Sequence, residues 1–111
     1  MANQMTGSEH RWGERITVNI PVQLSAHPLT GVHGCIKDIS LSGALVKTDA
    51  DLRLRSLIKI TMQLPPPLQR AGIVMARIAR KIDGDVGVEW CEFAPLVIKD
   101  LLHNAARRSS V

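Results

Sequence analysis

The chain has 111 residues, of which 45% are hydrophobic and 22% charged, and its formal net charge is +4. This length is typical of one domain with its own core, and the composition excludes a disordered chain. No apolar run approaches the ~20 residues of a membrane-spanning helix, and the N-terminus lacks the layout of a signal peptide, so we expect a cytoplasmic protein without membrane insertion.

The N-terminal residues 1–10, MANQMTGSEH, have no hydrophobic pattern, and we expect them to form a flexible lead. The stretch RWGER follows and places Arg11 and Arg15 four positions apart, directly before a strand pattern. Guanidinium groups bind phosphate through two parallel hydrogen bonds and stack on purine rings. Two arginines near a terminus are also common as solvated surface charge, so the pair alone does not identify a site.

Alternation of apolar and polar residues dominates the chain and predicts about six strands. The first is ITVNIPVQL, in which Pro21 suits an edge or a bulge because it donates no backbone hydrogen bond. The others are expected in VHGCIKDIS, GALVKT, IKITMQL, VMARIARKI and DVGVEWCEF. The segment LPPPLQ separates the fourth strand from the fifth because its prolines cannot continue a ladder. In the fifth strand, Arg80 interrupts an apolar series that ends at Ile82.

The hydrophobic period changes after Pro95, which suits the first position of a helix. Ile98, Leu101 and Leu102 then fall on one stripe at helical spacing, which predicts a C-terminal helix over about residues 95–106. We therefore predict an all-β fold with a terminal helix: a small six-stranded antiparallel β-barrel over residues 11–106, followed by a tail over 107–111. A sandwich of two sheets is the other option.

The sequence contains no glycine-rich phosphate loop, zinc-protease motif or nucleophile elbow. Its four histidines have no metal-ligand spacing, so we expect neither an enzyme nor a metal centre nor a bound cofactor. Cys35 and Cys91 are interpreted as two small buried hydrophobic residues rather than as a disulfide. Aromatic residues make up only 3% of the chain, which argues against a nucleic-acid partner because single strands bind by stacking on aromatic rings.

The segment DISLSGALV places Asp38, Ser40 and Gly43 where one strand turns into the next. A turn alone explains these residues, because Asp and Ser bond local backbone amides and Gly adopts a positive φ. A binding role is the alternative. Two positions apart on a strand end, Asp38 and Ser40 would share a face, where a carboxylate can accept N–H groups from the edge of a base. With the arginines, these are the groups that a nucleotide with phosphates and a guanine edge requires.

The motifs RWGER, DISLSG and GVEW, followed by a terminal helix, closely resemble the PilZ domain family over nearly the whole domain, from Arg11 to about His103. The resemblance implies a six-stranded antiparallel β-barrel with a C-terminal helix. It also implies binding of the bacterial second messenger cyclic di-GMP through the motifs Arg-x-x-x-Arg and Asp/Asn-x-Ser-x-x-Gly. Two positions depart from many relatives: His10 stands where a further basic residue is common, and Ser42 stands in place of a glycine.

Carried over by position, the resemblance implies that Arg11 and Arg15 hold the phosphates and contact the guanines. It implies that Asp38 and Ser40 hold a guanine edge and that Gly43 allows the strand turn to approach the ligand closely. Our leading interpretation is a non-enzymatic cyclic di-GMP receptor whose N-terminal arginine segment becomes ordered on the barrel and signals to a partner protein. In this family such partners belong to motility, pilus or exopolysaccharide machinery.

The alternative interpretation is a basic protein-interaction module that docks an acidic partner without binding nucleotide. Its support is the positive net charge and three basic strand positions, Lys59, Arg77 and Lys81. These positions also suit the solvated face of a barrel. RNA binding by a small barrel is a third option, which the scarcity of aromatic residues disfavours.

Overall fold

The computed structural model describes residues 15–64, 66, 68 and 70–109, and the side chains of those residues up to 104. The expected lead over residues 1–10 and the predicted site residue Arg11 lie outside the described residues. The elements run in the order β1 (Ile16–Ala26), β2 (Leu29–Ile39), β3 (Gly43–Lys47), β4 (Leu57–Gln63), β5 (Ala71–Ile82), β6 (Asp85–Trp90) and α2 (Leu96–Ser109).

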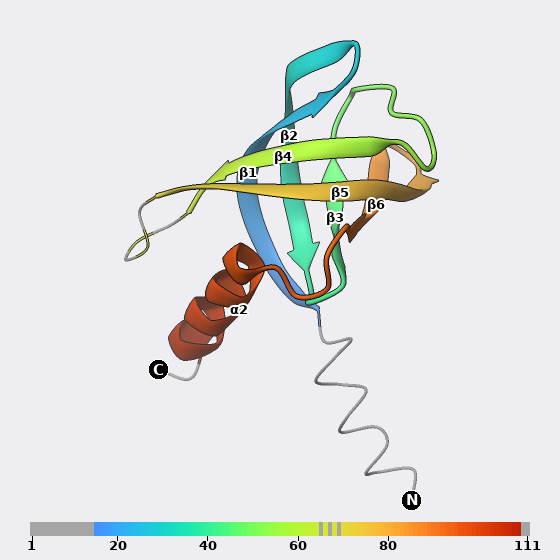
Figure 1. Ribbon diagram of the computed structural model, residues 1–111. Coiled ribbons are helices and arrows are strands. Elements are labelled where there is room, and N and C mark those ends of the chain that lie inside the picture. The colour runs from blue at the N-terminus through green and yellow to red at the C-terminus, as the bar shows by residue number, and fades with distance from the viewer. Residues whose placement is uncertain (1–14, 65, 67, 69, 110–111) are drawn as a thin grey trace, which may run out of the picture.

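The strands form a closed antiparallel barrel in the order β1-β2-β3-β6-β5-β4 (Figure 1). The first strand, β1, closes the barrel by pairing with β4, where Val22 lies opposite Met62. Pro21 lies just outside the β1–β4 register and close to an irregularity in the β1–β2 register between Thr17 and Ile20, as its missing N–H requires. The predicted six-stranded barrel with a C-terminal helix is confirmed, and the two-sheet sandwich is wrong.

Alternate residues of each strand point into the barrel and form one core. In β4, for example, Ile58 and Ile60 are buried, while Leu57 and Lys59 are exposed. The core residues of the six strands are Ile20, Val22, Leu24, Ile36, Ile39, Ala44, Val46, Ile58, Ile60, Met62, Val74, Ala76, Ile78, Val86, Val88 and Trp90. Burial of these aliphatic side chains is the main stabilising contribution to the fold.

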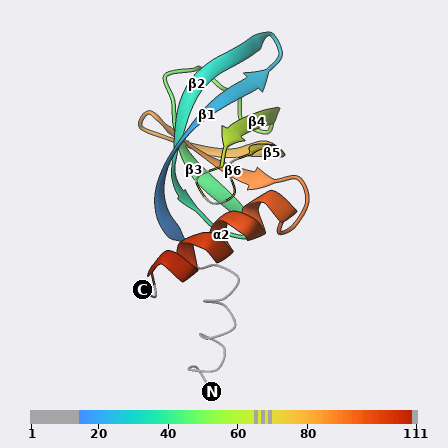
Figure 2. The same ribbon diagram turned by 90° about the vertical axis from the view of Figure 1, so that its left-hand side faces the viewer.

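The helix α2 lies across one end of the barrel, near the start of β1 (Figures 1 and 2). It buries Ile98 and Leu101 of the predicted stripe, and the Arg70–Asp100 ion pair joins it to the segment before β5. The helix begins one residue later than predicted, because Pro95 accepts its first hydrogen bond from Lys99, and it extends to Ser109 rather than to 106. Within the described residues, no helix combines the length and the apolar character that a transmembrane segment requires.

Two expectations about buried residues are wrong. Ile82 is 44% exposed, because a register shift between Ile78 and Arg80 interrupts the alternation of β5. Cys91 is exposed because β6 ends one residue before it, and Cys35 is only half-buried. Both thiols are free, in agreement with the expectation that they form no disulfide.

Candidate ligand-binding site

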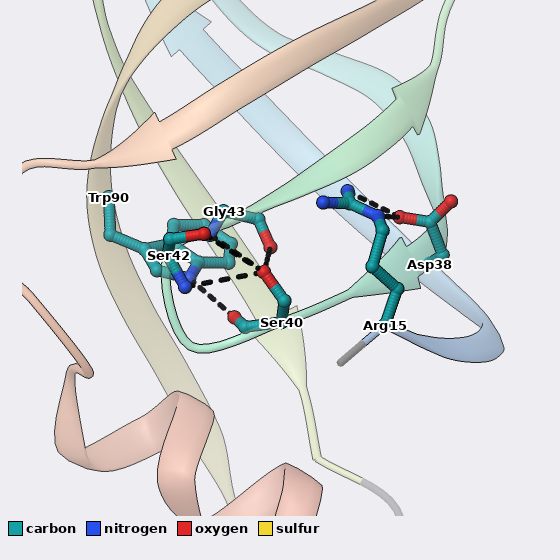
Figure 3. Close-up of polar contacts among 6 residues, drawn as sticks. All are labelled: Arg15, Asp38, Ser40, Ser42, Gly43 and Trp90. Atoms are coloured by element: carbon teal, nitrogen blue, oxygen red, sulfur yellow. Dashed lines mark hydrogen bonds and ion pairs between the residues drawn. The ribbon is translucent and has the colours of Figure 1, made fainter. Parts of the chain in front are cut away.

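The start of β1 and the end of β2 bring together two of the predicted site residues. The β1–β2 register places Thr17 opposite Asp38, so Arg15, just before β1, reaches the same carboxylate. Its Nε donates to Asp38 Oδ1 at 2.8 Å, and its Nη2 lies 2.5 Å from the same oxygen (Figure 3). The two side chains are 41% and 26% exposed, so this ion pair is open to an incoming anion.

Ser40 is fully buried, and its hydroxyl organises the turn from β2 to β3. The hydroxyl oxygen accepts the backbone N–H groups of Ser42 and Gly43, each at 3.3 Å. Because β2 ends at Ile39, Ser40 does not continue the strand, and its side chain points into the turn while Asp38 points toward Arg15 (Figure 3). The expectation that Asp38 and Ser40 share one face is therefore wrong, and contact between Ser40 and a ligand remains a prediction.

Gly43 begins β3 at a point where the strand has no room for a side chain. It lies opposite Glu89 of β6, and a Cβ placed on it would come within 2.0 Å of the Val88 carbonyl oxygen. Its φ is not positive, since the positive-φ glycines of the described residues are Gly31 and Gly84. Pairing of β3 with β6 thus requires glycine here for steric reasons, whereas the sequence suggested a requirement for unusual backbone angles.

Trp90, at the end of β6, also fixes this turn, and sequence reasoning did not assign it this role. Its indole N–H donates to the Ser40 carbonyl oxygen at 3.0 Å (Figure 3). Its backbone N–H donates to the Ser42 carbonyl oxygen, also at 3.0 Å. The side chain is 6% exposed. The turn that follows Asp38 is therefore held by the barrel as well as by its own hydroxyl.

Replacement of Trp90 by phenylalanine is expected to lower the free energy of unfolding by about 1–3 kcal/mol, because the buried Ser40 carbonyl loses its indole donor. Urea denaturation followed by far-UV circular dichroism measures this change. The exposed Met75→Leu variant is the control and should stay within about 0.5 kcal/mol of the original chain. Equal stability of the two variants would contradict the assigned role of the indole N–H.

A pocket of about 380 Å³ adjoins the turn on the outer face of β3, β6 and β5. Small residues of these strands, among them Gly43 and Gly87, line it, and its charged groups are Arg15, Arg80 and Glu89. A larger pocket of about 550 Å³ lies by the β1–β2 hairpin at the other end of the barrel, and none of the predicted site residues lines it. Among the described residues, no three His, Cys, Asp or Glu side chains are placed to hold a metal ion.

The chain is similar to proteins of one known family. The family model of the PilZ domain matches residues 8–105. The chain belongs to the PilZ domain family. PilZ domains are a family of cyclic di-GMP-binding regulatory modules, so the resemblance seen in the motifs is confirmed. No curated protein has a matching sequence.

Solved structures that resemble this PilZ domain include the following two. The Bacillus subtilis inhibitor of motility MotI/DgrA has a TM-score of 0.70 and 18% sequence identity, and the match covers 86% of this chain and 49% of that one. This chain thus spans about half the length of MotI/DgrA. The PilZ domain of CeSA from a cellulose synthesizing bacterium has a TM-score of 0.59 and 26% identity, and the match covers 85% of this chain and 92% of that one.

Proposed function

We propose that this PilZ domain is a non-enzymatic receptor for cyclic di-GMP and that Arg11, Arg15, Asp38, Ser40 and Gly43 form or support its binding site. The observation that carries the proposal is the Arg15–Asp38 ion pair, which joins the arginine motif to the second motif at the edge of a pocket. Both residues stand at motif positions of a family whose members bind this ligand.

Binding would exchange partners within this ion pair. In the free protein the Arg15 guanidinium is held by Asp38. A phosphate of the dianionic ligand offers the guanidinium a bidentate partner, and Asp38 is then free to accept N–H groups from a guanine edge. Opening the ion pair costs little, since an exposed pair contributes only about 0–1 kcal/mol.

The expected affinity follows from these contacts. A micromolar dissociation constant corresponds to about −8 kcal/mol, and hydrogen bonds to charged groups contribute about 1.5–3 kcal/mol each. Two guanidinium groups and one carboxylate can each form more than one such bond. Their summed contribution reaches about −8 kcal/mol after the free-energy cost of ordering the N-terminal segment is subtracted.

The ligand would order the segment that carries Arg11 and Arg15 on the barrel and create a surface that a partner protein can distinguish. The similar structures are an inhibitor of motility and a domain of CeSA from a cellulose synthesizing bacterium. We accordingly propose a downstream protein partner in motility, pilus or exopolysaccharide machinery.

Calorimetric titration of the full chain with cyclic di-GMP and with cyclic di-AMP, at ~0.05 M and ~0.5 M salt, tests the proposal. Cyclic di-GMP should bind with a micromolar or lower dissociation constant, because the arginines and Asp38 recognise both the phosphates and a guanine edge. Cyclic di-AMP should be rejected at both salt concentrations. Absence of binding, or equal binding of the two dinucleotides, would contradict a guanine-specific site.

A second candidate function, docking of an acidic partner, has one specific observation in its favour. The outer face of β4 and β5 exposes Leu57, Ile73 and Met75, and the register places Arg77 opposite Leu57 and Lys59 opposite Met75. Exposed apolar residues next to cations suit an acidic, partly apolar protein segment. Binding of this kind should weaken steeply as salt increases, whereas recognition of guanine should not.

A further inference from the structure

The pocket beside Gly43 contains a second arginine and a second carboxylate that neither motif includes. The strand registers form one continuous row across four strands, in which Asp38 lies opposite Leu45, Leu45 opposite Gly87, and Gly87 opposite Arg80. With strands about 4.8 Å apart, Asp38 and Arg80 mark the two ends of a strip about 14 Å wide. In the next row, Glu89 lies opposite Gly43.

The Arg80 side chain can lie flat against the barrel because Gly87, its neighbour on β6, has no side chain. A Cβ on Gly87 would lie 2.9 Å from both Cγ and Nε of Arg80, so the arginine side chain lies directly over the β6 backbone. Arg80 remains exposed, and its planar group lines the pocket. A guanidinium in this position offers a face on which a purine can stack.

Glu89 is exposed at the edge of the same pocket. Each of the four ion pairs found among the described residues involves other side chains, so the carboxylate of Glu89 and the guanidinium of Arg80 are both available. An ionised carboxylate accepts hydrogen bonds only, through two oxygens. It therefore matches the two adjacent N–H donors on the edge of a guanine.

Cyclic di-GMP contains two guanines, and the motif carboxylate Asp38 can serve only one of them. We propose that Arg80 and Glu89 form the subsite for the second guanine, with Arg80 stacking on the base and Glu89 accepting its N–H groups. This inference rests on the proposed function. The proposed site then consists of two arginine–carboxylate pairs on either side of Gly43. One pair is Arg15 with Asp38, and the other is Arg80 with Glu89.

A mixed dinucleotide separates the two subsites. The ligand 3′,3′-cyclic GMP-AMP carries one guanine, which Asp38 can bind, and one adenine, which lacks the N–H pair that Glu89 would accept. The unmodified chain should therefore bind cyclic di-GMP about tenfold more tightly than cyclic GMP-AMP. In Glu89→Gln one oxygen becomes an NH₂ donor, so cyclic di-GMP should bind about tenfold more weakly while cyclic GMP-AMP changes little.

Arg80→Ala should weaken both ligands about tenfold, because stacking does not distinguish the two purines. The controls are Glu92→Gln and Arg70→Ala, which change exposed residues outside the pocket lining and should bind within about twofold of the unmodified chain. Calorimetric titration measures all affinities, and circular dichroism checks that each variant is folded.

The subsite is overturned if Glu89→Gln binds cyclic di-GMP like the unmodified chain, or if it weakens both dinucleotides equally. It is also overturned if Arg80→Ala binds like Arg70→Ala. Failure of the unmodified chain to bind cyclic di-GMP is a separate result, which contradicts the proposed function itself. The two failures therefore cannot be confused.

Discussion

Replacement of Arg15 by alanine is expected to weaken cyclic di-GMP binding about 10- to 100-fold, as measured by calorimetric titration. The guanidinium is 41% exposed, lies at the pocket edge and is held by Asp38 in the free protein. Loss of charge-assisted hydrogen bonds to a phosphate removes about 1.5–3 kcal/mol, and every 1.4 kcal/mol is a factor of ten in affinity.

Arg70→Ala is a closely matched control. Arg70 also forms an exposed ion pair with an aspartate, Asp100, and the two side chains are 50% and 33% exposed, but neither lines the pocket. Each variant should lose no more than about 1 kcal/mol of stability, so unfolding cannot explain a difference in binding. If Arg15→Ala and Arg70→Ala bind cyclic di-GMP with equal affinity, the arginine motif is not the phosphate site.

The fold could be predicted because most of its determinants are local. Residues such as Ile58 and Ile60 alternate with Lys59 and Thr61, and alternation of this kind reports directly which face of a strand is buried. The number of strands and the short connections then favoured a closed barrel. The wrong prediction that Ile82 is buried shows the limit of this pattern. The register shift after Ile78 depends on pairing with β6, so the sequence of β5 alone carries no sign of it.

The site was less predictable because its geometry depends on single positions and on long-range pairing. Whether Ser40 shares the face of Asp38 depends on whether β2 ends at residue 39 or continues. The hydrogen bond between Trp90 and Ser40 joins residues fifty positions apart, and a tryptophan in a strand is otherwise interpreted simply as core. That Arg80 and Glu89 line one pocket likewise depends on the β5–β6 register, which places Arg80 opposite Gly87 and Arg77 opposite Glu89.

Gly43→Ala is expected to lower the free energy of unfolding by about 3 kcal/mol, which for a domain of this size corresponds to roughly 12–24 °C in melting temperature. The added Cβ would lie 2.0 Å from the Val88 carbonyl oxygen and 3.3 Å from Glu89 Cα. Both atoms belong to the β6 backbone, which cannot rotate away as a side chain could, so β3 and β6 must separate locally. Thermal unfolding followed by circular dichroism measures the effect.

Gly84→Ala distinguishes crowding from backbone strain. Gly84 has a φ of 83°, and no neighbouring atom lies within 4 Å of the position that a Cβ would take, so alanine there costs only the strain of a left-handed residue, about 1 kcal/mol. A Gly43→Ala variant no less stable than Gly84→Ala would show that the β3–β6 spacing does not require glycine. If that stable variant had also lost cyclic di-GMP binding, the glycine of the second motif would serve the approach of the ligand, as the family resemblance implied, and not the pairing of the strands.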